Sequence, residues 1–168
     1  MPLSMYQASV PTLTRALNNL IGVLDKGAAH AEAKKIDPAV LAASRLFPDM
    51  FPLVKQIQIA SDVSKIGTSR LAQVEPPKYE DNETTLAEMV ARLRKTVAYL
   101  ETLKPEQIDG SEERTITWTA QGTTHSLPGR QYLFQRVLPN VFFHVTTAYN
   151  ILRHNGVELG KQDYLGRS

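Results

Sequence analysis

The chain has 168 residues, a formal net charge of +2 and no cysteine. Its length fits one domain with one hydrophobic core, which we place at residues 1–168. Hydrophobic residues make up 42% of the chain and charged residues 21%, values that argue against disorder. The 19 basic and 17 acidic residues are scattered, so no nucleic-acid partner is expected. The lack of cysteine excludes disulfides and thiolate ligands, so any metal must use histidine, carboxylate or amide donors.

The N-terminal segment MPLSMYQASVPTL has neither a basic leader nor an uninterrupted apolar run. Nowhere do about 18 apolar residues follow one another, which is what a membrane-spanning helix needs. We therefore expect no membrane segment and a cytoplasmic location.

Apolar residues at helical spacing predict a first long helix from Ser4 to about His30, with a kink or a separate first turn at Pro11. Asp37 is then a predicted N-cap, with Pro38 at the first position of a short helix that ends at Ala43.

A second long helix is predicted from Leu53 to about Val74, with Asp49 as its cap and one buried stripe of apolar residues. The stripe comprises Leu53, Val54, Ile57, Ala60, Val63, Ile66, Leu71 and Val74. Two prolines make residues 75–79 an extended connector. A third long helix follows from Thr85 to about Leu103, opened by a capping box between Thr85 and Glu88.

The hydrophobic period then changes. Residues 114–118 and 123–127 alternate and are rich in β-branched side chains, which predicts a small hairpin lying against the helices. A fourth long helix is predicted from about Gln131 to Asn155, kinked at Pro139 and stopped at Gly156. The tail, residues 157–168, is expected to drape over the helices.

These elements predict an all-α fold: a four-helix bundle with long crossover connections and a small β-hairpin before the last helix. The last helix is apolar on nearly all sides, which indicates either central burial or a dimer seam over its outer face. Within it, Asn140 and His144 stand one turn apart on a common face.

The run from His144 to Gly156, HVTTAYNILRHNG, resembles the last helix of the DinB-like superfamily. Together with LSMYQASVP and PDMFPLVKQIQIASD, it looks like one uncharacterised bacterial branch of that superfamily, a domain of unknown function. The resemblance covers nearly the whole chain. It implies a four-helix bundle, often a homodimer, with a divalent metal held by one histidine on the second helix and two on the fourth.

Carried onto this sequence, the resemblance implies an incomplete histidine triad. His144 matches the second histidine of the last helix, but Asn140 stands at the first position. The position on the second helix falls at Gln58, or at Gln56 if the alignment slips, and Asp62 matches a frequent acidic residue.

Three interpretations remain open. Gln58, Asn140 and His144 form a buried hydrogen-bond cluster in place of the metal, since buried polar groups need partners. Alternatively, the same three residues retain a weak or altered zinc or nickel site that recruits Asp62 or Asp49. In the third, His144 itself binds a ligand or acts in catalysis.

Aromatic residues add a candidate pocket near His144, although such residues more often belong to the core. They are Trp118, Tyr132, Phe134, Phe142, Phe143 and Tyr149. The leading hypothesis is a homodimeric protein with a degenerate metal site and no cofactor, which binds a small molecule or serves as an interaction scaffold. The alternative is a metal-dependent hydrolase or thiol transferase with His144 as the surviving ligand.

Overall fold

The structure, a computed structural model, describes residues 4–166; residues 1–3 and 167–168 of the predicted domain lie outside the described part. The fold is mostly helical, with a two-stranded antiparallel hairpin before the last long helix. The elements in chain order are α1 (Met5–Lys34), α2 (Pro38–Ala43), α3 (Leu53–Ala72), α4 (Leu86–Thr102), α5 (Pro105–Ile108), β1 (Thr115–Ala120), β2 (Thr123–Pro128), α6 (Gly129–Gln131), the π-helical segment η1 (Tyr132–Val137), α7 (Leu138–His154) and α8 (Lys161–Leu165).

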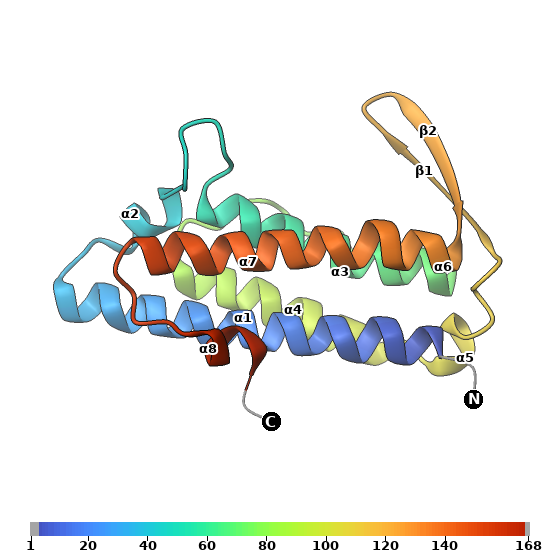
Figure 1. The fold of residues 1–168 in the computed structure, drawn as a ribbon, viewed down its shortest axis with the longest axis horizontal. Helices are drawn as coiled ribbons and strands as arrows, with labels where there is room; N and C mark the ends of the chain where they lie inside the picture. Colours follow the sequence, from blue (N-terminus) through green and yellow to red (C-terminus); the bar gives the residue numbers. More distant parts are fainter. Residues whose placement is uncertain (1–3, 167–168) are drawn as a thin grey trace.

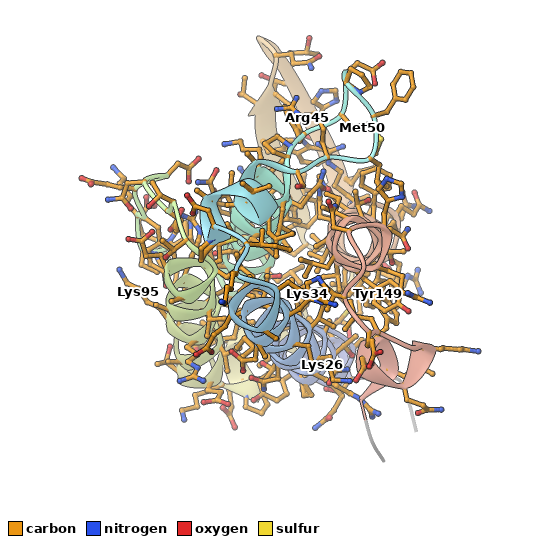
Figure 2. The ribbon with its side chains drawn as sticks, turned by 90° about the vertical axis from the view of Figure 1, so that its left-hand side faces the viewer. Lys26, Lys34, Arg45, Met50, Lys95 and Tyr149 are labelled. Carbon is orange, nitrogen blue, oxygen red and sulfur yellow. The ribbon has the colours of Figure 1, made fainter. Side chains whose placement is uncertain are left out.

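Four long helices, α1, α3, α4 and α7, pack side by side around one hydrophobic core (Figure 1). Seen along the helices, α4 and α7 lie on opposite sides, with α1 and α3 between them (Figure 2). α1 and α7 run in one direction, and α3 and α4 run in the other (Figure 1). The chain must therefore return along the full length of α3 before α4 begins.

The segment between α3 and α4 makes this return. A helix of 20 residues such as α3 is about 30 Å long, whereas residues 73–85 reach about 45 Å when extended. Pro76 and Pro77 hold the segment out of helical conformation, as the sequence predicted. A short extended segment thus carries the crossover.

Local signals place several of the helix ends. Asp37 caps α2 by accepting a hydrogen bond from the Ala39 N–H at 2.9 Å. The capping box of α4 between Thr85 and Glu88 is present as predicted. α1 continues through Pro11 without a separate first turn, because the Gln7 carbonyl, which proline cannot bond, accepts from the Thr12 hydroxyl at 3.3 Å.

Two predictions for α3 are wrong. Its N-cap is Pro52, without a side-chain cap bond, rather than Asp49, which is exposed. Its apolar stripe is also narrower than predicted, since Val74 is exposed and Val54, Val63 and Ile66 are only half-buried. Instead α3 buries small hydroxyl residues, namely Ser61, Ser64, Thr68 and Ser69. Serine and threonine hydroxyls can be buried in a helix because they bond to a carbonyl one turn back, as Ser64 does to Ala60 at 2.7 Å.

The hairpin was expected to lie against the helices, but it extends away from them and contacts them only near its base (Figure 1). Its anchors are Ile116, which is buried, and Trp118, whose ring lies 5.2 Å from that of Tyr132. The turn at Gln121 and Gly122 has positive φ at both residues, which favours glycine at the second.

The last long helix begins with a π-helical segment. In η1 the Leu138 N–H bonds to the Leu133 carbonyl, and Pro139, which has no N–H, sits in the first turn of α7. The helix ends before Gly156, whose φ is +90°. The tail then packs on α1, where Asn19 donates to the Tyr164 carbonyl at 3.0 Å.

Within residues 4–166, no helix has the length and apolar character needed to cross a membrane.

Candidate functional site

His144, on α7, is hydrogen-bonded to Gln56 on the neighbouring α3. Its Nδ1 lies 2.6 Å from Oε1 of Gln56, and the two residues are 8% and 2% exposed. Nε2 of Gln56 donates to the Phe51 carbonyl at 2.9 Å, so both ends of the amide are satisfied. The Phe143 ring meets the imidazole edge-on, with 5.2 Å between ring centroids.

This arrangement defines the protonation state of His144. Because Oε1 of Gln56 can only accept, Nδ1 must carry the proton, and the lone pair lies on Nε2. Burial lowers the pKa of His144, so the ring is neutral near pH 7. Within residues 4–166, the side-chain hydrogen bond of His144 is the one at Nδ1, so Nε2 has no hydrogen-bond partner there.

Gln58 does not share this contact: of the two positions left open on the second predicted helix, Gln56 and not Gln58 is hydrogen-bonded to His144. Positions 56 and 58 are about 200° apart around a helix, so they face different neighbours. Nε2 of Gln58 donates instead to Oε2 of Glu83 at 2.9 Å, on the crossover segment.

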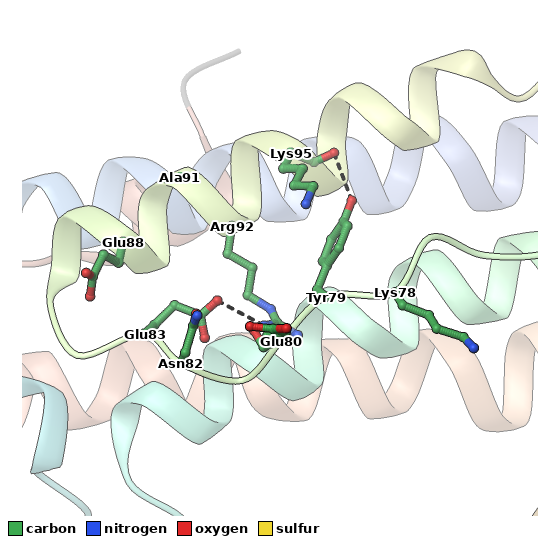
Figure 3. Close-up of a pocket in the computed structure, with 9 residues that line it drawn as sticks. All are labelled: Lys78, Tyr79, Glu80, Asn82, Glu83, Glu88, Ala91, Arg92 and Lys95. Atoms are coloured by element: carbon green, nitrogen blue, oxygen red, sulfur yellow. Dashed lines mark hydrogen bonds and ion pairs between the residues drawn. The ribbon is translucent and has the colours of Figure 1, made fainter.

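Arg92 of α4 is the centre of a second polar cluster, which sequence reasoning missed. It donates to Oε1 of Glu83 and Oδ1 of Asp62, each at 2.9 Å, and to Oγ of Ser61 at 3.2 Å. It also bonds the Glu80 carbonyl at 2.9 Å, which ties the crossover segment to α4 (Figure 3). The signal was an arginine between Met89 and Leu93 on the buried face, because a charge there must have partners.

The charges in this cluster compensate one another. Burial lowers the pKa of Arg92, but the hydrogen bond to Glu83 and the charges of Asp62 and Glu83 outweigh it, and the pKa is raised overall. Asp62 also accepts from Lys65 at 2.8 Å. The hydrogen bond from Lys55 lowers the pKa of Asp81, which lies 3.1 Å from Arg92. The cluster is therefore a saturated ion-pair network that fixes the crossover segment.

Asn140 lies on the wall of a cavity between α3, η1 and the hairpin. This cavity has a volume of about 210 Å³, and we call it the hairpin cavity. Its charged and aromatic lining residues are Asp62, Arg70, Trp118, Tyr132 and Arg136. No hydrogen bond within residues 4–166 joins Asn140 to His144, so the predicted polar trio is divided among three places.

The remaining aromatic candidates do not form one pocket. Tyr149 is half-buried and packs edge-on against Tyr164 of α8, with 6.3 Å between ring centroids. Phe142 faces the same tail, whereas Phe134 and Phe143 are exposed. Only Trp118 and Tyr132 of the predicted set line the hairpin cavity.

The donors around His144 do not fit a zinc or nickel ion. Such ions favour several imidazole, thiolate or carboxylate donors in one shell. Here Nδ1 of His144 donates its hydrogen bond to Oε1 of Gln56, so neither atom is free to bind a metal. Among residues 4–166, no group of three or more histidine, aspartate or glutamate side chains is placed to hold a metal ion.

Comparison with known proteins places the whole chain in a family. The model of a domain of unknown function, DUF1993, matches residues 5–165. A crystal structure of a DinB family member protein from Shewanella denitrificans is 43% identical, with a TM-score of 0.87, and the match covers 97% of this chain and 92% of that one. No curated protein matches. The chain therefore belongs to the DUF1993 family of DinB-like proteins.

Proposed function

We propose that this chain is a single DinB-like four-helix-bundle domain in which a hydrogen-bonded His144–Gln56 pair stands in place of the metal centre. In this proposal the protein binds a small molecule and catalyses no reaction. The observation that carries it is the 2.6 Å contact between Nδ1 of His144 and Oε1 of Gln56, both buried.

The chemistry of the pair supports a structural role. A neutral imidazole and a carboxamide bond each other without burying a charge, and the amide NH2 of Gln56 donates to the Phe51 carbonyl. Asp62, the carboxylate expected to assist a metal, is held by Arg92 and Lys65. Withdrawing it would leave Lys65, which is 4% exposed and has no other ion-pair partner within residues 4–166, as a buried positive charge without compensation.

One observation favours the alternative, a metal-dependent hydrolase or thiol transferase that keeps His144 as a ligand. Burial lowers the pKa of His144, and Nε2 has no hydrogen-bond partner within residues 4–166, so one neutral imidazole nitrogen is available. Gln58 cannot complete that site while it bonds Glu83, so the alternative requires Asn140 and further donors to move.

Metal analysis separates the two functions. The protein is purified without a histidine tag, incubated with Zn²⁺ or Ni²⁺, dialysed and analysed for bound metal. We expect far less than one ion per chain, and the same result for His144→Ala. One ion per chain that disappears in His144→Ala would overturn the proposal in favour of the enzyme.

A gain-of-function variant tests the position of the lost centre. Gln56→His with Asn140→His places three imidazoles on the paired faces of α3 and α7, and we expect it to bind about one Zn²⁺ per chain. The matched control, Gln58→His with Asn140→His, directs the imidazole toward Glu83 and should not. Equal metal uptake by both variants would contradict the assignment of Gln56.

We also propose that the protein is a homodimer. Phe51, whose backbone carbonyl accepts from Gln56, and Phe143, whose ring meets that of His144, are 56% and 57% exposed. Large exposed apolar side chains near one another are typical of interaction surfaces.

A further inference from the structure

The hairpin cavity contains more positive charge than its own residues neutralise. Arg70 and Arg136 both line it, and neither takes part in an ion pair within residues 4–166. The carboxylate in the lining belongs to Asp62, and its Oδ1 already accepts from Arg92 at 2.9 Å and Lys65 at 2.8 Å. The two cavity arginines are therefore available to an anion.

The two guanidinium groups are oriented by aromatic rings instead of carboxylates. Nη1 of Arg70 donates to the Tyr132 hydroxyl at 3.0 Å, and the Arg136 guanidinium lies 6.0 Å from the centre of the Trp118 ring. Because the Tyr132 oxygen accepts from Arg70, its own proton remains free to donate to a ligand. Oriented donors lose less entropy on binding an anion than free side chains do.

The rest of the cavity suits an apolar ring. Trp118 and Tyr132 meet at 48° with their centroids 5.2 Å apart, and Val63, Ile66 and Val137 complete the wall. A volume of about 210 Å³ lies below the range of about 300–1,000 Å³ for drug-sized ligands, so the ligand must be small.

We propose that the hairpin cavity binds a small monocyclic aromatic carboxylate. Arg70 and Arg136 hold the carboxylate, since guanidinium groups match its planar geometry, and Trp118 packs against the ring. The inference rests on the proposed function, because it names the ligand class of a protein that binds a small molecule.

The test uses benzoate as the probe. Trp118 is the single tryptophan of the chain, so its fluorescence reports on this cavity. Benzoate should change the fluorescence saturably, and benzamide, which is neutral and of similar shape, should bind at least about tenfold more weakly. Inorganic phosphate should compete only much more weakly than a second aromatic carboxylate, because it can reach the arginines but lacks the ring.

Two variants locate the binding. Arg136→Gln and Arg70→Gln should each weaken benzoate binding at least about tenfold. Arg130→Gln is the matched control, because Arg130 is exposed and pairs with Glu113 at 3.2 Å outside the cavity. Arg136 is also exposed, so its variant should keep the thermal midpoint of the wild type even if Arg70→Gln does not.

The inference is overturned if benzoate gives no saturable change, if benzamide or phosphate binds equally well, or if Arg136→Gln keeps the wild-type affinity. None of these results would contradict the proposed function. That function is contradicted only if the protein binds one metal ion per chain through His144. Calorimetric titration of the same protein with benzoate confirms that the fluorescence change is binding.

Discussion

The buried guanidinium of Arg92 should be one of the most sensitive side chains in the molecule. Arg92→Met removes the partner of Glu83, whose side chain is 8% exposed, and of Asp62. We expect a loss of about 3–5 kcal/mol in the free energy of unfolding, measured with urea, because a buried carboxylate is left unpaired. Arg94→Met, on the exposed face of the same helix, should change stability by less than about 0.5 kcal/mol. Similar losses in both variants would show that the network is not what stabilises the crossover.

His144 should make the stability depend on pH. Because burial lowers its pKa in the folded protein, the unfolded chain takes up a proton first as the pH falls. The contribution of His144 is complete above about pH 6.5, the ordinary pKa of histidine, and declines as the pH falls below that value toward the folded pKa.

The variant His144→Gln should therefore flatten the dependence of the unfolding free energy on pH between about 7 and 5. His154→Gln, at the exposed end of α7, should leave the slope as in the wild type. Denaturant titrations at several pH values measure both. A slope that persists unchanged in His144→Gln would assign it to another group.

The sequence could identify residues but not their partners. His144 and Asn140 stand out as polar residues on an apolar helix, yet only the rotation of α3 decides whether Gln56 or Gln58 faces His144. The family resemblance implies Asp62 as a possible metal ligand, whereas its partner in the structure is Arg92 on another helix, and the parallel packing of α3 and α4 that joins them has no local signal.

At the scale of elements, the start of α6 depends on a glycine. Gly129 packs on the Ser111 carbonyl so closely that an added Cβ would overlap it, and its N–H is held by the Arg114 carbonyl at 2.8 Å. Gly129→Ala should lower the free energy of unfolding by about 1–3 kcal/mol, because the backbone at Gly129 and the backbone at Ser111 cannot easily move apart.

The matched substitution in α1 should have the opposite sign. A Cβ at Gly22 would meet nothing within 4 Å, so Gly22→Ala should stabilise by about 0.5–1 kcal/mol through helix propensity. Thermal unfolding of both variants provides the comparison. Equal effects in the same direction would mean that contact at Gly129 does not matter.

Elements with local signals were predicted well, and those defined by tertiary contacts were not. The capping box at Thr85 and the cap at Asp37 depend on residues a few positions apart, and both are present. The hydroxyl-rich face of α3 was missed because serine and threonine score as polar, although each can bond its own helix. Crossovers were expected only in long connections, yet the segment between α3 and α4 is short. It suffices because extended backbone reaches about twice as far per residue as helix.

At the scale of the whole molecule, both the family resemblance and the exposed aromatic residues support a homodimer. We expect light scattering at tens of micromolar to give a mass near twice 18.7 kDa. Phe143→Ser should weaken association at least about tenfold, because an exposed aromatic side chain at an interface carries much of the binding energy. Phe134→Ser, at a residue 40% exposed on η1, is the control and should leave the mass unchanged. A wild-type mass of one chain would remove the dimer, whereas a dimer unaffected by Phe143→Ser would place its interface away from the His144–Gln56 pair.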